Sequence, residues 1–134
     1  MADSWQAAKP HKETTVRIAT LDKLLEEREL RAPIIIKIDV EDNEAAVLRG
    51  ARGMIGRYRP AIVCEILPRA HNNKATVEAL ADLNYSAFAI TVDGCFRFGA
   101  DDFRLPRQFT DFLLLPSETL DPSVMFIPAR SEQA

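Results

Sequence analysis

The sequence is short of cysteine, of long apolar runs and of basic charge, and each shortage excludes a class of protein. Cys64 and Cys95 are its only cysteines, so we expect reduced, structural thiols rather than a disulfide framework. No apolar run approaches the roughly 20 residues that span a bilayer, and Met1–Pro10 lacks the apolar core of a signal peptide. Basic residues number 17 against 20 acidic ones, which argues against nucleic acid as a partner. We therefore expect a cytoplasmic protein that binds neither membranes nor nucleic acids.

Hydrophobic residues make up 47% of the 134 residues, which is enough for the core of one small globular domain. Residues 1–13 are polar and show no periodicity, so we predict a flexible N-terminal arm. Residues 14–116 carry the helix and strand patterns of an α/β domain. Residues 117–134 contain several Ser, Glu and Pro residues, and we predict a C-terminal tail with one apolar patch at 124–127.

Three amphipathic helices are predicted from apolar residues that recur at helical spacing. The first covers the residues around Leu21–Leu25, the second runs from about Val47 to Tyr58, and the third covers about 74–83. Residue types suited to capping lie at their ends. The predicted caps are Thr20, Asp42 or Asn43, and Asn84.

Strands are predicted at 15–19, 34–41, 61–66, 86–92, 95–98 and 109–115, the last of these closing the domain. The first half of 34–41 is continuously β-branched, which is typical of a strand buried on both faces. The strand, helix and strand between residues 34 and 66 indicate a right-handed parallel crossover. Asp93-Gly94 is a two-residue hairpin signal. The sequence thus predicts a mixed α/β sheet with a parallel core and an antiparallel C-terminal hairpin.

Charged side chains gather where two of these strands end. Lys37, Asp39 and Glu41 alternate along one side of the first, and Glu65 lies near the end of the second. Ligands of open parallel sheets bind outside the C-terminal ends of the strands. An alternative is that the carboxylates cap the next helix and interact with its dipole. The candidate catalytic residues are Asp39, Glu41 and Glu65, and the candidate substrate-binding residues are Lys37 and His71, the latter in the loop after the second strand.

Neither a metal site nor a cofactor turn is predicted from the remaining polar and glycine residues. The acidic residues between 39 and 44 are of the type that binds Mg²⁺ or Ca²⁺, but their spacing lacks the Gly and terminal Glu of a calcium loop. A solvated acidic turn is the favoured interpretation. Gly50, Gly53 and Gly56 recur inside a helix, whereas a cofactor turn lies between a strand and a helix. We interpret these glycines as positions of close packing.

An ordered series of motifs between Val16 and Pro116 resembles the FkbM-type methyltransferases. The motifs are Thr20-Leu21-Asp22, Ile36-Lys37-Ile38-Asp39-Val40-Glu41, Val47-Leu48-Arg49-Gly50-Ala51, Arg59-Pro60, Cys64-Glu65-Ile66 and Asp111-Phe112-Leu113. These enzymes use S-adenosylmethionine, and many methylate oxygen atoms of sugars or natural products. The resemblance implies a partial doubly wound, Rossmann-like sheet and O-methyl transfer to a small molecule or sugar. It also implies that Asp39 or Glu41 orients the acceptor hydroxyl or serves as the general base.

The sequence departs from the family pattern in two places. The family commonly has Gly after the Asp-Val-Glu triplet, whereas this sequence has Asp42. The resembled fold also begins with a strand and a Gly-rich turn that holds the methionine part of the donor, and nothing upstream of Val16 supplies either. We therefore expect a C-terminal half of the domain that does not bind S-adenosylmethionine alone, with its cofactor-binding residues unknown.

Such a half-domain would leave the sheet incompletely covered. Helices would lie mainly on one face, and the 34–40 strand would lack a neighbour on one side, which exposes an apolar edge. We therefore expect a homo-oligomer or a complementing chain, and a small-molecule acceptor if the domain is active. The alternative function is a non-catalytic α/β binding or assembly module that oligomerises through its uncovered sheet face.

Overall fold

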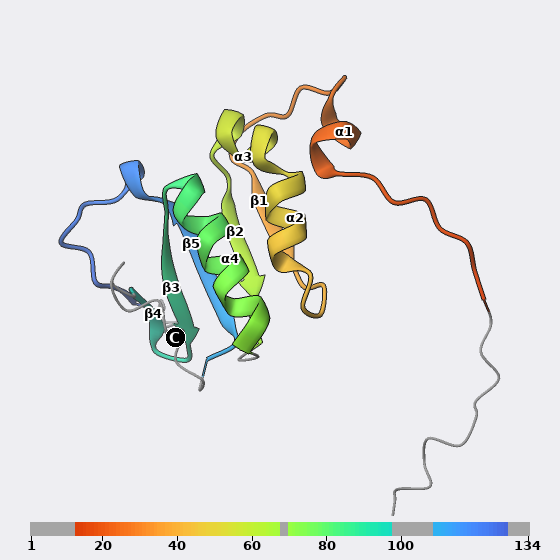
Figure 1. Ribbon diagram of the computed structural model, residues 1–134. Coiled ribbons are helices and arrows are strands. Elements are labelled where there is room, and N and C mark those ends of the chain that lie inside the picture. The colour runs from red at the N-terminus through yellow and green to blue at the C-terminus, as the bar shows by residue number, and fades with distance from the viewer. Residues whose placement is uncertain (1–12, 68–69, 98–108, 129–134) are drawn as a thin grey trace, which may run out of the picture.

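The computed structural model describes residues 13–67, 70–97 and 109–128, with the backbone alone described for 70–73 (Figure 1). Most of the predicted N-terminal arm lies outside these residues. The helices and strands are α1 (Leu21–Leu25), β1 (Ile35–Ile38), α2 (Glu44–Gly50), α3 (Arg52–Tyr58), β2 (Ala61–Glu65), α4 (Ala70–Leu83), β3 (Tyr85–Thr91), β4 (Gly94–Arg97), β5 (Asp111–Pro116), the 3₁₀ turn η2 (Ser117–Thr119) and β6 (Phe126–Pro128).

The strands form one six-stranded mixed sheet in the order β1-β2-β5-β3-β4-β6. β1 and β2 are parallel, as the strand–helix–strand pattern predicted. β5 lies between β2 and β3 and is antiparallel to both, so β3 runs in the same direction as β1 and β2. β4 and β6 extend the sheet as antiparallel strands beyond β3. The predicted mixed α/β fold with a parallel pair and an antiparallel hairpin is confirmed.

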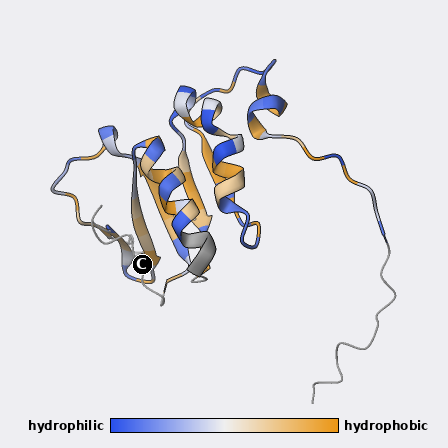
Figure 2. Ribbon diagram, in the orientation of Figure 1, coloured by the Kyte–Doolittle hydropathy of each residue, from blue (hydrophilic) through white to orange (hydrophobic). Residues whose placement is uncertain are grey.

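The core lies between the sheet and helices α2, α3 and α4, which cover the same face (Figure 1). Alternate strand residues point into it, and the strands at the centre of the sheet are correspondingly hydrophobic (Figure 2). Burying one such Ile, Leu or Phe side chain stabilises the fold by about 1.5–3 kcal/mol. Buried strand residues of this core include Ile38, Ile62, Cys64, Phe112 and Leu114, and they pack with Leu48, Met54, Ile55, Leu80 and Leu83 of the helices.

The opposite face of β1 is exposed, so the predicted burial of this strand on both faces is wrong. The side chain of Ile35 is 74% exposed and Lys37 is exposed, while Ile38 on the helix side is buried. No helix of the described residues packs against that side, and β1 is an edge strand. The β-branched run therefore reflects strand propensity rather than two-sided burial.

The region predicted as one helix from Val47 to Tyr58 is two helices. Ala51, with φ −114° and ψ 7°, separates α2 from α3. Glycine at positions 50 and 53 weakens the helix on either side of the break. The predicted strand at 15–19 is also wrong, because these residues are exposed and pair with no strand among those described.

α4 begins at Ala70, so His71 lies in its first turn and not in a loop as predicted. The buried stripe of this helix is Thr76, Ala79, Leu80 and Leu83, which follow helical spacing. Ala81 falls outside the stripe and is exposed. Asn84 adopts the predicted left-handed conformation, with φ 57°.

The C-terminal part of the sheet differs from the prediction in two respects. The hairpin turns at Val92-Asp93, and Gly94 is the first residue of β4, paired with Thr91. Gly94 has φ 141°, and a side chain there would collide with the Ile127 carbonyl of β6. β5 is not the last strand, because β6 pairs with β4 from within the segment predicted as a tail.

Candidate functional site

The candidate site lies at the ends of three adjacent strands. Ile38 is paired with Cys64, so Asp39 follows β1 beside Glu65, the last residue of β2. Glu65 is paired in turn with Asp111, the first residue of the antiparallel strand β5. Three carboxylates from distant parts of the sequence thereby form one row across the sheet.

Lys37 supplies positive charge close to this row. Its Nζ lies 2.5 Å from Oδ2 of Asp39, two residues along the same side of the strand. This hydrogen bond, together with a second one from Glu65, holds the pKa of the Asp39 carboxyl below its ordinary value. The same pair raises the pKa of Lys37. Because both side chains are largely exposed, the pair orders charge in the site more than it stabilises the fold.

Glu65 has the opposite electrostatic environment. Its carboxyl group shares a hydrogen bond with Asp39, and this bond is the main cause that raises the pKa of Glu65 above 4.5. Partial burial and the negative charges of Asp39, Asp111 and Glu41 raise the pKa further. When the two carboxyl groups share a single proton, it lies on Glu65, because Lys37 favours the ionised form of Asp39 while the pKa of Glu65 is the one that is raised.

The structure brings together three of the five predicted site residues, namely Lys37, Asp39 and Glu65. Glu41 lies in the loop after β1, in a left-handed conformation with φ 47°, and only its charge reaches Glu65. His71 is placed in α4, and its side chain is outside the described atoms. Asp111 was not predicted, because only the pairing of β5 with β2 places it beside Glu65.

Two further groups bear on the chemistry of the site. Burial raises the pKa of the Cys64 thiol to about 12, so this cysteine is protonated and serves as core, not as a nucleophile. Within the described part of the chain, no three His, Cys, Asp or Glu side chains are arranged to hold a metal ion. None of the described helices is long and apolar enough to cross a membrane.

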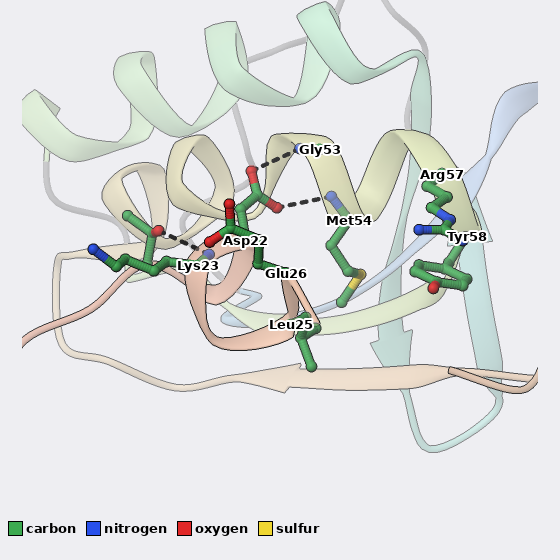
Figure 3. Close-up of a pocket in the computed structure, with 9 residues that line it drawn as sticks. Asp22, Lys23, Leu25, Glu26, Gly53, Met54, Arg57 and Tyr58 are labelled. Carbon is green, nitrogen blue, oxygen red and sulfur yellow. Dashed lines mark hydrogen bonds between the residues drawn. The ribbon is translucent and has the colours of Figure 1, made fainter. Parts of the chain in front are cut away.

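A pocket of about 580 Å³ lies between α1 and α3, and Thr20 and Asp22 of the Thr20-Leu21-Asp22 motif help to line it (Figure 3). Asp22 accepts hydrogen bonds from the backbone N–H groups of Gly53 and Met54, at 2.9 and 2.8 Å. Thr20 accepts one from Lys23 N at 3.2 Å and so caps α1 as predicted. The motif therefore fastens α1 onto the start of α3.

A second hollow of about 820 Å³ lies along β1. Apolar residues of β1, of α2 and of the segment before α1 line it, including Ile18, Leu24, Ile36, Val40 and Val47. Ile18 and Leu24 are exposed. The hollow thus continues the helix-side surface of the sheet past the edge strand.

An α/β sheet with carboxylates at the ends of its parallel strands fits the general class of enzymes that bind ligands at that edge. Residues 2–87 match the methyltransferase FkbM domain, and the match covers more than half of the chain. The chain belongs to this family of methyltransferases. Comparison with curated proteins and with solved structures gives no match.

The family generally uses S-adenosylmethionine, and the described residues do not fit the Gly-rich turn that would hold it. The β1–α2 connection, residues 39–43, has no glycine, and Glu41 and Asp42 in it have φ of 47° and 72°. The described glycines lie in α2, α3 and β4. Asp42 has a left-handed φ, which a glycine would adopt without strain.

Proposed function

We propose that this chain supplies the acceptor side of an O-methyl transfer reaction, with Glu65 as the general base. Transfer of a methyl group to a hydroxyl oxygen requires removal of the hydroxyl proton. The observation that carries the proposal is the strand pairing that sets Glu65 between Asp39 and Asp111 at the edge of the sheet where ligands bind. The acceptor class is a hydroxylated small molecule or sugar.

The environment of Glu65 suits this role. A general base is most effective when its pKa approaches the working pH, and the neighbouring carboxylates shift the pKa of Glu65 in that direction. Glu65 accepts the proton from the acceptor hydroxyl, and the resulting carboxylic acid donates its hydrogen bond to Asp39. Asp39 is a positioning residue, which Lys37 keeps ionised. In this proposal, donor binding falls to residues other than those described.

Methyl transfer from labelled S-adenosylmethionine to a panel of hydroxylated acceptors tests the proposal. Glu65→Gln keeps the size and hydrogen-bonding capacity of the side chain but removes the base, so turnover is expected to fall roughly 10²–10⁴-fold. Asp82→Asn is the matched control. Asp82 is an exposed carboxylate, and its ion pair with Arg52, at 3.4 Å, is also exposed. Wild-type turnover in Glu65→Gln, with an unchanged acidic limb of the pH–rate profile, would contradict the proposal.

A non-catalytic assembly module is the second candidate function. The exposed face of β1 is the observation that supports this alternative. Calorimetric titration with S-adenosylmethionine separates the two functions. Saturable binding supports the methyltransferase, and no binding at millimolar donor supports the module.

A further inference from the structure

Within the described part of the chain, the edge of β1 that faces away from β2 has no strand partner. The carbonyl of Ile34 accepts a hydrogen bond from Ala61 N at 3.1 Å, and Ile35 is the residue paired with Ala61. The N–H and C=O groups of one strand residue point to the same side, and successive residues alternate between the two sides. The backbone groups of Ile36 and Ile38 therefore face β2. The N–H and C=O groups of Ile35 and Lys37 therefore point to the open edge.

The side chains along this edge match those of a second copy of the same segment that runs in the opposite direction. Read in either direction, the segment Ile36-Lys37-Ile38-Asp39-Val40 alternates apolar and charged residues, and reversal exchanges the sign of the two charges. Antiparallel pairing of two copies centred on Ile38 thus places Lys37 opposite Asp39 twice. The same pairing places Ile36 opposite Val40 on the helix side. Each apolar residue meets an apolar one, and each charge meets its opposite.

Backbone geometry leaves few competing registers. Residues that exchange hydrogen bonds across the edge must both have outward-facing backbone groups, as Ile35 and Lys37 do. Asp39 follows the last residue of β1, and it gains this role if the pairing extends the strand by one residue. A register with Lys37 opposite itself brings like charges together, which is destabilising. A register with Lys37 opposite Ile35 leaves both lysines without a charged partner. A register with Asp39 opposite itself also brings like charges together, and one with Ile35 opposite itself pairs no lysine with an aspartate. The register centred on Ile38 is therefore the best matched.

Two features of the surroundings fit this register. β1 ends at Ile38, and the left-handed φ of 47° at Glu41 prevents the strand from extending beyond Val40, where the complementary segment also ends. The hollow of about 820 Å³ borders β1 on the helix side and is lined largely by apolar residues. Apolar surface of this kind beside an open strand edge favours association.

We propose that two copies of this chain form a symmetric dimer by antiparallel pairing of their β1 edges, with Lys37 opposite the partner's Asp39. The two lysines and two aspartates then alternate in sign around the two-fold axis, on the exposed face of a continuous sheet. The isologous contact is closed, so it ends at two copies and does not propagate into fibres. This inference does not depend on the methyltransferase assignment, because association needs neither donor nor acceptor.

Light scattering after size exclusion, over a range of protein concentrations, tests the dimer. The expected mass is twice the 15.0 kDa of one chain. Lys37→Glu opposes two negative charges in each pair, and the dissociation constant is expected to rise by at least about tenfold. The double variant Lys37→Glu/Asp39→Lys exchanges the charges and is expected to restore the dimer. Circular dichroism checks that each variant is folded, which the exposure of both side chains favours.

Three outcomes would overturn the proposal. A wild-type chain that stays monomeric at every concentration excludes the dimer. A dimer that Lys37→Glu leaves unchanged uses another surface. A dimer that Lys37→Glu weakens, but that the charge exchange does not restore, excludes the register centred on Ile38.

Discussion

Glu65 is held in surroundings that oppose its ionisation, and this has a consequence for stability. Its pKa in the folded chain is raised above 4.5, chiefly by the hydrogen bond with Asp39. The folded chain therefore binds this proton more tightly than the unfolded chain does. The stabilisation from proton binding is fully present below about pH 4.5 and is lost as the pH rises through the folded-state pKa. A residue suited to act as a base thus reduces stability at neutral pH.

Glu65→Gln is accordingly expected to raise the urea midpoint of unfolding at pH 7 but to change it little at pH 4. At pH 7 the substitution removes a charge that its neighbours repel, whereas at pH 4 the wild-type side chain is itself mostly protonated. Urea unfolding followed by circular dichroism at the two pH values measures this. Asp82→Asn, at an exposed ion pair, is the control and should show no such pH dependence. An equal change at both pH values would contradict the assignment of the shared proton to Glu65.

At the scale of helices, α1 is attached to the domain by one carboxylate and two partly buried leucines. α1 has five residues, none of them fully buried, so its own hydrogen bonds are too few to make it stable alone. Asp22 bridges it to the first turn of α3, and Leu21 and Leu25 pack against the core. The carboxylate also satisfies two N–H groups that a helix start leaves unpaired. The break between α2 and α3 is therefore part of how α1 is bound.

Asp22→Ala is expected to destabilise the chain by about 1–2 kcal/mol, within the range found for loss of a helix cap. Asp22→Asn keeps one oxygen acceptor and should lose less. Urea midpoints and hydrogen exchange at Gly53 and Met54 measure both effects. If Asp22→Ala leaves the exchange of these two amides unchanged, the carboxylate does not hold α3.

On the scale of the whole molecule, single residues tie together segments that are far apart in sequence. Arg59, in a left-handed conformation after α3, forms a two-pronged ion pair with Glu118 of η2, at 2.5 and 2.7 Å. It also donates to the carbonyl of Leu83 at the end of α4 and stacks over Tyr85. These contacts hold the residues after β5 in place, although their composition predicted a tail.

Local patterns were enough to predict most elements and part of the site. Residue spacing predicts the strand at β2 and the helix caps Thr20 and Asn84. The geometry of parallel strands predicts that Asp39 lies close to Glu65. Asp111 could not be predicted, because its place depends on the position of β5 between β2 and β3. The burial of β1 on both faces was wrongly predicted from residues 34–41, because burial depends on which elements cover the two faces of the sheet.

The most direct test of the acceptor site is a pH titration of the Asp39 and Glu65 carboxyl groups by carbon-13 NMR. The expected result is a midpoint for Glu65 above its ordinary 4.5 and one for Asp39 below its ordinary 3.8, with each resonance responding to the other group. Asp111→Asn should lower the midpoint of Glu65, because it removes a neighbouring negative charge. Independent titrations, with Glu65 at or below 4.5, would contradict the proposed base.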